Sequence, residues 1–180
     1  DETVADHALG MMLCLARGFH QIDPLVKKGE WSTLRKERPT LNSSSIGIVG
    51  LGNIGSKIAQ RAFAFGMNIL YHTPSPKNNP WKYCSSIHEL AEKVNYLVIA
   101  CPGGKETLHM VNKDVLQALG HEAYLINISR GSVVDTNALI EALDHGTIAG
   151  AALDVFENEP QIDSKLLGCN NILLTPHISG

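Results

Sequence analysis

The sequence has 180 residues, of which 44% are hydrophobic and 18% are charged, a balance typical of a chain that buries a core. Its 15 Lys and Arg residues against 18 Asp and Glu residues give a formal net charge of −3, which excludes a strongly basic nucleic-acid binder. The longest apolar run, residues 8–16, is too short to cross a bilayer, so we expect neither nucleic acid nor a membrane as a partner.

The cysteines and histidines show none of the spacings typical of metal sites. No two of the 4 Cys residues form a CxxC pair, and none of the 8 His residues forms an HxH or HxxxH pair beside a carboxylate. We therefore expect no metal site, reduced cysteines that pack as small apolar residues, and a cytoplasmic location.

Residues 1–45 predict a crossover helix and a loop in front of the core. Val4 to Gln21 carries apolar residues on more than half of a helical circumference, so we expect one long helix that is covered on several sides. Part of that cover is expected to come from outside this chain. Residues 27–45 are polar and rich in serine, which predicts a loop.

Residues 46–180 alternate short apolar runs with helical patterns. Nearly continuous apolar runs are typical of parallel strands that are buried on both faces. The alternation predicts a doubly wound, Rossmann-type α/β sheet with helices on both faces. For the last helix, Asp135 is a candidate N-cap and Gly146 a C-terminal stop. The expected strands are 46–49, 68–71, 96–100, 124–128, 148–153 and 172–174, and the expected helices are 54–65, 87–93, 113–119 and 136–145.

A glycine-rich loop, Gly50-Leu51-Gly52-Asn53-Ile54-Gly55, follows the first core strand and opens a helix. GxGxxG alone is a weak signal, but between a strand and a helix it indicates a dinucleotide site. Gly50 would permit the turn, Gly52 would let a pyrophosphate approach the backbone, and Gly55 would let the helix pack closely. The helix N-terminus, with Asn53 and Ile54, would face the phosphates.

The end of the second core strand favours NADP as the cofactor, with NAD possible. An acidic residue here would bind the ribose 2′-hydroxyl of NAD, but Thr73 stands at that place. His72 and Lys77 add positive charge beside it. The alternative is that Lys77 is a solvated loop residue with no such role.

Three later segments, 127–131, 153–160 and 175–180, each follow a predicted strand. They should therefore meet the glycine loop at the carboxyl edge of the sheet, where ligands bind in open α/β folds. Together they bring an Arg, a Glu and a His beside a nicotinamide site. This combination suggests a redox reaction on a carbonyl compound that carries a carboxylate.

On these motifs the chain resembles the coenzyme-binding domain of the D-isomer-specific 2-hydroxyacid dehydrogenases. Within that family it is most similar to the glyoxylate/hydroxypyruvate reductases, through residues 100–104 and 127–135. That subgroup commonly carries arginines after the second strand, where Pro74 and Ser75 stand here, so its NADP preference carries over only in part. The motifs that carry the likeness, in the family's order and spacing, are GLGNIG, NISRG, LDVFENEP and TPHIS.

The resemblance implies an NAD(P)-dependent enzyme that reduces a small 2-keto acid to the D-2-hydroxy acid. Arg130 would bind the substrate carboxylate and polarise its carbonyl. His177 would be the general acid, oriented and kept protonated by Glu159. Asp154 would contact the nicotinamide carboxamide. The resemblance places the cofactor against Cys101, Pro102, Thr107, Ile128, Ser129, Arg130, Asp154, His177 and Gly180.

The resemblance also implies that residues 1–180 are an NAD(P)-binding domain whose substrate-binding domain is missing at both ends. We therefore expect this fragment alone to be inactive, and the whole protein to form a homodimer through the N-terminal helix. The alternative function is that of a dinucleotide-sensing, corepressor-like interaction protein on the same fold.

The remaining aromatic and histidine residues have ordinary structural interpretations. Trp31 and Trp81 are expected to be packing anchors. His7, His20, His88, His109, His121 and His145 are expected to lie mostly on the surface or on helix faces.

Overall fold

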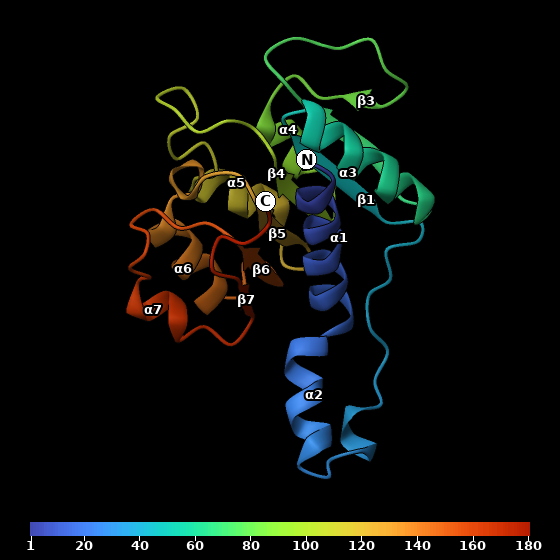
Figure 1. The fold of residues 1–180 in the computed structure, drawn as a ribbon, viewed down its shortest axis with the longest axis vertical. Coiled ribbons are helices and arrows are strands. Elements are labelled where there is room, and N and C mark those ends of the chain that lie inside the picture. The colour runs from blue at the N-terminus through green and yellow to red at the C-terminus, as the bar shows by residue number, and fades with distance from the viewer.

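Seven parallel strands form one sheet in the order β3-β2-β1-β4-β5-β6-β7 in the computed structural model, which describes residues 1–180 (Figure 1). All six predicted strands are present, with small shifts at their ends, and the doubly wound fold is confirmed. The strands are β1 (Ser45–Val49), β2 (Asn68–His72), β3 (Lys82–Tyr83), β4 (Tyr96–Ile99), β5 (Tyr124–Asn127), β6 (Gly150–Leu153) and β7 (Ile172–Leu174).

Helices cover both faces of the sheet. In β4, Tyr96 and Val98 belong to the core shared with α1 and α3, whereas Leu97 and Ile99 belong to the core shared with α4, α5 and α6. This alternation is the period-2 pattern of a strand that is buried on both sides. The helices are α1 (Glu2–Arg17), α2 (Phe19–Lys27), α3 (Asn53–Ala64), α4 (Ile87–Ala91), α5 (Lys113–Leu119), α6 (Thr136–Asp144) and α7 (Ser164–Leu167).

Helix α6 has the ends that the sequence predicted. The side chain of Asp135 accepts a hydrogen bond from the backbone N of Ala138 at 3.1 Å. At the other end Gly146 adopts a left-handed conformation with φ 66°, and its N–H donates to Leu143. Glycine enters this region without a Cβ clash, so it stops the helix.

The prediction of one unbroken helix from Val4 to Gln21 is wrong. Gly18 adopts φ 67° and ends α1, and α2 starts at the next residue. The apolar face of α1 is buried against α3 and strands β5 to β7 of its own chain. Helix α2 buries no residue and extends beyond the sheet (Figure 1).

The two tryptophans differ in their surroundings. Trp81 packs against Phe63 with ring centroids 5.5 Å apart, as an anchor should. Trp31 is 67% exposed, so within this chain it anchors nothing and that expectation is wrong. No helix of the structure combines the length and apolar composition that crossing a membrane requires.

Candidate functional site

The site lies where the strand order reverses, between β1 and β4. Gly50 follows β1 and Cys101 follows β4, so both lie at the carboxyl edge of the sheet. Gly50 has φ 92°, and a Cβ there would stand 2.7 Å from the backbone of Cys101. Only glycine fits this approach of two loops, and such switch points form the ligand crevices of α/β sheets.

The next two glycines shape the start of α3. A Cβ on Gly55 would stand 2.0 Å from the carbonyl oxygen of Gly50, whereas a Cβ on Gly52 would meet nothing within 4 Å. Helix α3 begins at Asn53, directly after Gly52, and no side chain caps it. The free N–H groups of its first turn, beside open space, suit an anionic phosphate group.

A cavity of about 640 Å³ opens in front of the glycine loop. Its other walls are residues 72–77 after β2 and residues 101–110 after β4. The expected cofactor contacts that line it are Gly50, Gly52, Thr73, Cys101, Pro102 and Thr107. The expected contacts that do not line it are Asn53, Ile54, Gly55, Ile128, Ser129, Arg130, Asp154, His177 and Gly180.

The loop after β2 is folded onto the glycine loop. Thr73 is buried, and its hydroxyl donates to the carbonyl of Ser75 at 2.7 Å. The ammonium of Lys77 donates to the carbonyl of Leu51 at 2.8 Å. Lys77 is therefore held at the mouth of the cavity, which disfavours the alternative of a freely solvated loop lysine.

Arg130 leaves the carboxyl end of β5 on a loop that is fixed by Asn127. The buried Asn127 donates through Nδ2 to the carbonyl of Arg130 at 3.0 Å and accepts from the backbone N of Ser129 at 3.1 Å. The stem of Arg130 packs so closely on Gly103 that a Cβ there would stand 2.7 Å from Arg130 Cγ. Arg130 is exposed, and its guanidinium donates to the carbonyl of Ser129 at 2.6 Å but forms no ion pair in this chain. Its remaining donors can therefore bind a carboxylate.

His177 and Glu159 form a direct pair. His177 Nδ1 lies 2.7 Å from Glu159 Oε2, and Glu159 Oε1 accepts from the backbone N of Phe156 at 2.8 Å. The hydrogen bond to His177 lowers the pKa of Glu159 against a smaller opposing effect of burial. The chain offers no hydrogen-bond partner to His177 Nε2, and the side chain is partly exposed, so this nitrogen can exchange a proton with a group from outside the chain.

Asp154 holds the turn that carries His177. It is fully buried, and it accepts hydrogen bonds from the backbone N of Ile178 and of Ser179, each at 3.0 Å. Burial by itself would raise the pKa of Asp154, but these bonds and one from the Thr175 hydroxyl lower it. With no exposed surface, Asp154 positions the turn. Its contact with a nicotinamide carboxamide stays a prediction.

The sequence did not reveal two residues that support the site. His7 Nε2 lies 3.1 Å from the Thr175 hydroxyl, which itself donates to Asp154 at 2.5 Å, so His7 is not a plain surface residue. No local pattern could have shown a contact across 168 residues. Asn127 had a usable signal, because an Asn at the end of a strand with Ser two residues later is typical of a side-chain-stabilised turn.

The glycine loop at the switch point, with a His–Glu pair and a free Arg at the same edge, matches a known domain. The sequence profile of the "D-isomer specific 2-hydroxyacid dehydrogenase, NAD binding domain" family matches residues 9–179. The chain belongs to this family.

Named relatives agree with this assignment. Over 179 residues the chain is 42% identical to a glyoxylate/hydroxypyruvate reductase of Arabidopsis thaliana, and equally to a hydroxyphenylpyruvate reductase of Plectranthus scutellarioides. Each match covers 98% of this chain and 57% of the relative, so the chain spans little more than half their length. An NADPH-dependent glyoxylate/hydroxypyruvate reductase from Sinorhizobium meliloti, solved with NADP and malonate, is 43% identical with a TM-score of 0.92, over 99% of this chain and 57% of that one.

Proposed function

We propose that this protein reduces a small 2-keto acid of the glyoxylate or hydroxypyruvate type to the D-2-hydroxy acid, using NAD(P)H. The observation that carries the proposal is the His177–Glu159 pair with a free Nε2, at the same sheet edge as the cavity and the unpaired Arg130. The relatives named above are reductases, which supports an enzyme and gives no support to the corepressor alternative.

The cavity fits a nicotinamide dinucleotide. Gly52 leaves the open space that a pyrophosphate needs, and the uncapped start of α3 supplies N–H donors. Cys101, Pro102 and Thr107, on the neighbouring loop after β4, would line the nucleotide. When bound, the reduced nicotinamide supplies the hydride.

The chain's own residues bind the substrate and move the proton. Arg130 would hold the keto acid carboxylate with its planar fork of donors and draw electron density from the adjacent carbonyl. His177 would donate the Nε2 proton to the carbonyl oxygen as that oxygen gains negative charge. Glu159, bound to Nδ1, would fix the ring and stabilise the imidazolium before the transfer.

We favour NADP over NAD as the cofactor, with NAD also accepted. Thr73 leaves no carboxylate to repel a 2′-phosphate, and Lys77 places an ammonium at the mouth of the cavity. The Sinorhizobium relative is named NADPH-dependent. Pro74 and Ser75, which stand where the subgroup commonly has arginines, make the expected preference modest.

We also propose a homodimer in the cytoplasm, with a second domain supplied by a longer chain. The exposed apolar surface of α2 supports the dimer, and four free cysteines accord with a reducing compartment.

The decisive test of the proposed function is turnover by the full-length protein. Glyoxylate, hydroxypyruvate and hydroxyphenylpyruvate would each be assayed with NADPH and NADH. Including the aromatic keto acid matters because relatives named for the small and the aromatic substrates are equally similar to this chain. Reduction of a small keto acid, abolished in His177→Ala, is the expected result. Tight dinucleotide binding without turnover of any keto acid would favour the sensing alternative.

A further inference from the structure

His109 joins two loops of the site, although the sequence suggested an ordinary surface residue. Its Nε2 lies 2.5 Å from Glu157 Oε1, and its Nδ1 lies 4.0 Å from Asp135 Oδ2. His109 belongs to the loop after β4, whereas Glu157 belongs to the loop after β6. The contact therefore spans two separate crossovers at the carboxyl edge of the sheet.

The backbone of His109 joins the loop that lines the cavity to the loop that carries Arg130. His109 adopts φ 49°, and its N–H donates to the carbonyl of Ser132 at 2.8 Å, two residues beyond Arg130. Its neighbours Thr107 and Met110 line the dinucleotide cavity. A displacement of His109 would therefore move residues in one wall of that cavity.

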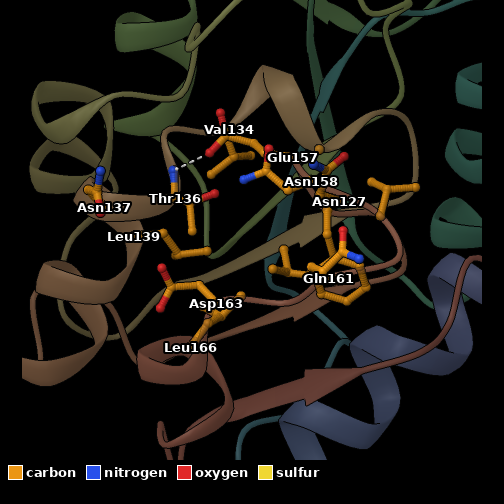
Figure 2. Close-up of a pocket in the computed structure, with 14 residues that line it drawn as sticks. Asn127, Val134, Thr136, Asn137, Leu139, Glu157, Asn158, Gln161, Asp163 and Leu166 are labelled. Atoms are coloured by element: carbon orange, nitrogen blue, oxygen red, sulfur yellow. Dashed lines mark hydrogen bonds between the residues drawn. The ribbon is translucent and has the colours of Figure 1, made fainter.

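Glu157 is fixed at the other end of the contact. Its second oxygen accepts from the backbone N of Thr136 at 3.2 Å, at the start of α6 (Figure 2). A small cavity of about 120 Å³ lies beside this loop, and Glu157 is one of the residues that line it. The hydrogen bonds of Glu157 to His109 and Thr136 therefore help to hold the loop in position. The same loop carries Glu159, which accepts from the backbone N of Phe156 at 2.8 Å.

The Glu157 loop also touches the Arg130 loop. A Cβ on Gly131 would stand 1.9 Å from the carbonyl carbon of Phe156, so the two backbones are in direct contact. The Arg130 loop therefore contacts both the loop after β4, which lines the cavity, and the loop after β6, which carries Glu157 and Glu159. The His109–Glu157 hydrogen bond links the loop after β4 to the loop after β6 directly.

We propose that the His109–Glu157 pair is a latch that couples the wall of the dinucleotide cavity to the loop carrying Glu159. The two are positioning residues, because they act through other groups and not on the substrate. The role in reduction rests on the proposed function, whereas the coupling between the loops does not. The His109–Glu157 contact holds Glu159 in the position where it contacts His177.

The latch depends on pH through His109. The charged groups within 4.0 Å of the ring are Glu157 and Asp135, both acidic, and Lys113 nearby pairs with Glu141 instead. The hydrogen bond to Glu157 raises the pKa of His109, against a smaller effect of burial. Burial by itself would raise the pKa of Glu157, but hydrogen bonds from Thr136 and His109 lower it, so the pair is fully charged at pH values between the lowered pKa of Glu157 and the ordinary pKa of His109. It weakens as pH rises through the raised pKa of His109.

The coupling is tested first without substrate, by NMR on the full-length protein. The His109 ring signal, assigned with His109→Gln, should titrate at lower pH in Glu157→Gln than in the parent. His109→Ala should shift the backbone amide signal of Phe156, which donates to Glu159. His88→Ala, which removes an exposed histidine paired with Glu92 at 3.7 Å on α4, is the matched control and should leave the Phe156 signal unchanged.

The second measurement is a double-mutant cycle with NADPH and the keto acid. His109→Ala and Glu157→Gln should each weaken NADPH binding and lower kcat by about threefold to fivefold at pH near 6, the range of a partly exposed ion pair. The double variant should be no worse than either single variant. His109→Gln, which keeps a donor, should recover part of the loss and guards against misfolding of the alanine variant.

Three results would overturn the latch: additive losses in the double variant, a loss of NADPH affinity with kcat intact, or a Phe156 signal that ignores His109→Ala. Failure of the proposed function looks different. In that case no keto acid is turned over by the parent, yet the NMR signals still report whether the two loops are coupled.

Discussion

Two carboxylates control His177 in different ways. Glu159 contacts the ring directly at 2.7 Å, whereas the buried Asp154 accepts two backbone N–H groups of the turn that follows it. His177 itself adopts φ 55°, a conformation that costs free energy in a residue with a Cβ and has to be held by its surroundings. Glu159 therefore holds the ring through Nδ1, and Asp154 holds the turn that carries it.

Glu159→Gln should move the pH profile of the enzyme. The carboxylate stabilises the imidazolium, and reduction needs protonated His177, so the alkaline limb of kcat/KM for reduction should move to lower pH. Oxidation of the hydroxy acid needs the neutral ring, so its acid limb should move the same way. His177→Ala should cost about 10²–10⁴-fold in both directions. A Glu159→Gln profile that overlays the parent would contradict the pairing.

Arg130→Lys should raise KM for the keto acid and lower kcat, with kcat/KM reduced about tenfold to hundredfold. Lysine keeps the charge but loses the planar two-pronged contact. Arg35→Lys, at an exposed arginine without a side-chain hydrogen bond, is the control and should behave like the parent. Steady-state kinetics at saturating NADPH are the measurement, and unchanged constants would make Arg130 a surface residue only.

Thr73→Asp should move the cofactor preference toward NADH. A carboxylate at this position repels a 2′-phosphate and accepts from a ribose 2′-hydroxyl. We expect the NADPH to NADH ratio of kcat/KM to fall by about tenfold or more, that is about 1.4 kcal/mol. Lys77→Ala should lower the same ratio by removing positive charge. A parent enzyme that already prefers NADH by tenfold would refute this interpretation of the loop.

At the scale of elements, α1 and α3 are joined by charge as well as by apolar packing. Glu2 at the start of α1 pairs with Lys57 and Arg61 of α3, and Asp6 pairs with Arg61 at 2.6 Å. These pairs lie on the surface, where each adds little to the free energy of unfolding. Their geometric effect is to fix α1 beside the helix that begins at the glycine loop.

Glu2→Gln should lower Tm slightly at neutral pH. Hydrogen bonds from Lys57 and Arg61 lower the pKa of Glu2 from 4.5 to about 2, so its contribution is present above the first value and disappears as pH falls toward the second. Thermal unfolding of parent and variant should converge near that lower pH and in high salt. Asp23→Asn, at an exposed i,i+4 pair within α2, should show no such pH-dependent difference. A pH-independent gap for Glu2→Gln would contradict the ionic origin.

Sequence periodicity predicted the helices and strands in which the apolar pattern runs over the whole element. It missed the features that depend on a single residue or on pairing with a neighbouring strand. Strand β1 and helix α6 were predicted because continuous apolar runs and spaced apolar residues extend over whole elements. Gly18 broke the expected first helix because a lone glycine in an apolar pattern can be either tolerated or a stop. β3, only Lys82–Tyr83, exists because it pairs with the edge of β2, which no local pattern encodes.

The candidate site shows the same contrast between regular patterns and single contacts. The position of Arg130, Glu159 and His177 at the carboxyl edge was predictable because each follows a strand, and parallel strands end at one edge. The contacts of His7 and His109 were not, because they join segments distant in sequence and depend on side-chain direction. Both residues looked like ordinary polar positions on a helix or in a loop.

At the scale of the whole molecule, polar chemistry and apolar surface lie in different places. The cavity and the catalytic candidates gather at the carboxyl edge of the sheet, whereas α2 and the segment after it extend away from the core (Figure 1). Phe19 is 55% and Trp31 67% exposed on this extension, and α2 buries nothing within the chain. Large exposed apolar side chains grouped on a projecting element are typical of an interface.

Phe19→Asp and Trp31→Asp should each convert the proposed homodimer to a monomer in full-length protein. A stable interface buries about 800 Å² per partner, and a charge placed at its apolar centre is left unpaired and desolvated. Sedimentation or light scattering measures the mass. Leu108→Asp, at a residue 58% exposed in the loop after β4, changes the same kind of side chain at the carboxyl edge of the sheet and should leave the dimer intact. A parent that sediments as a monomer, or a dimer indifferent to both substitutions, would remove α2 from the interface.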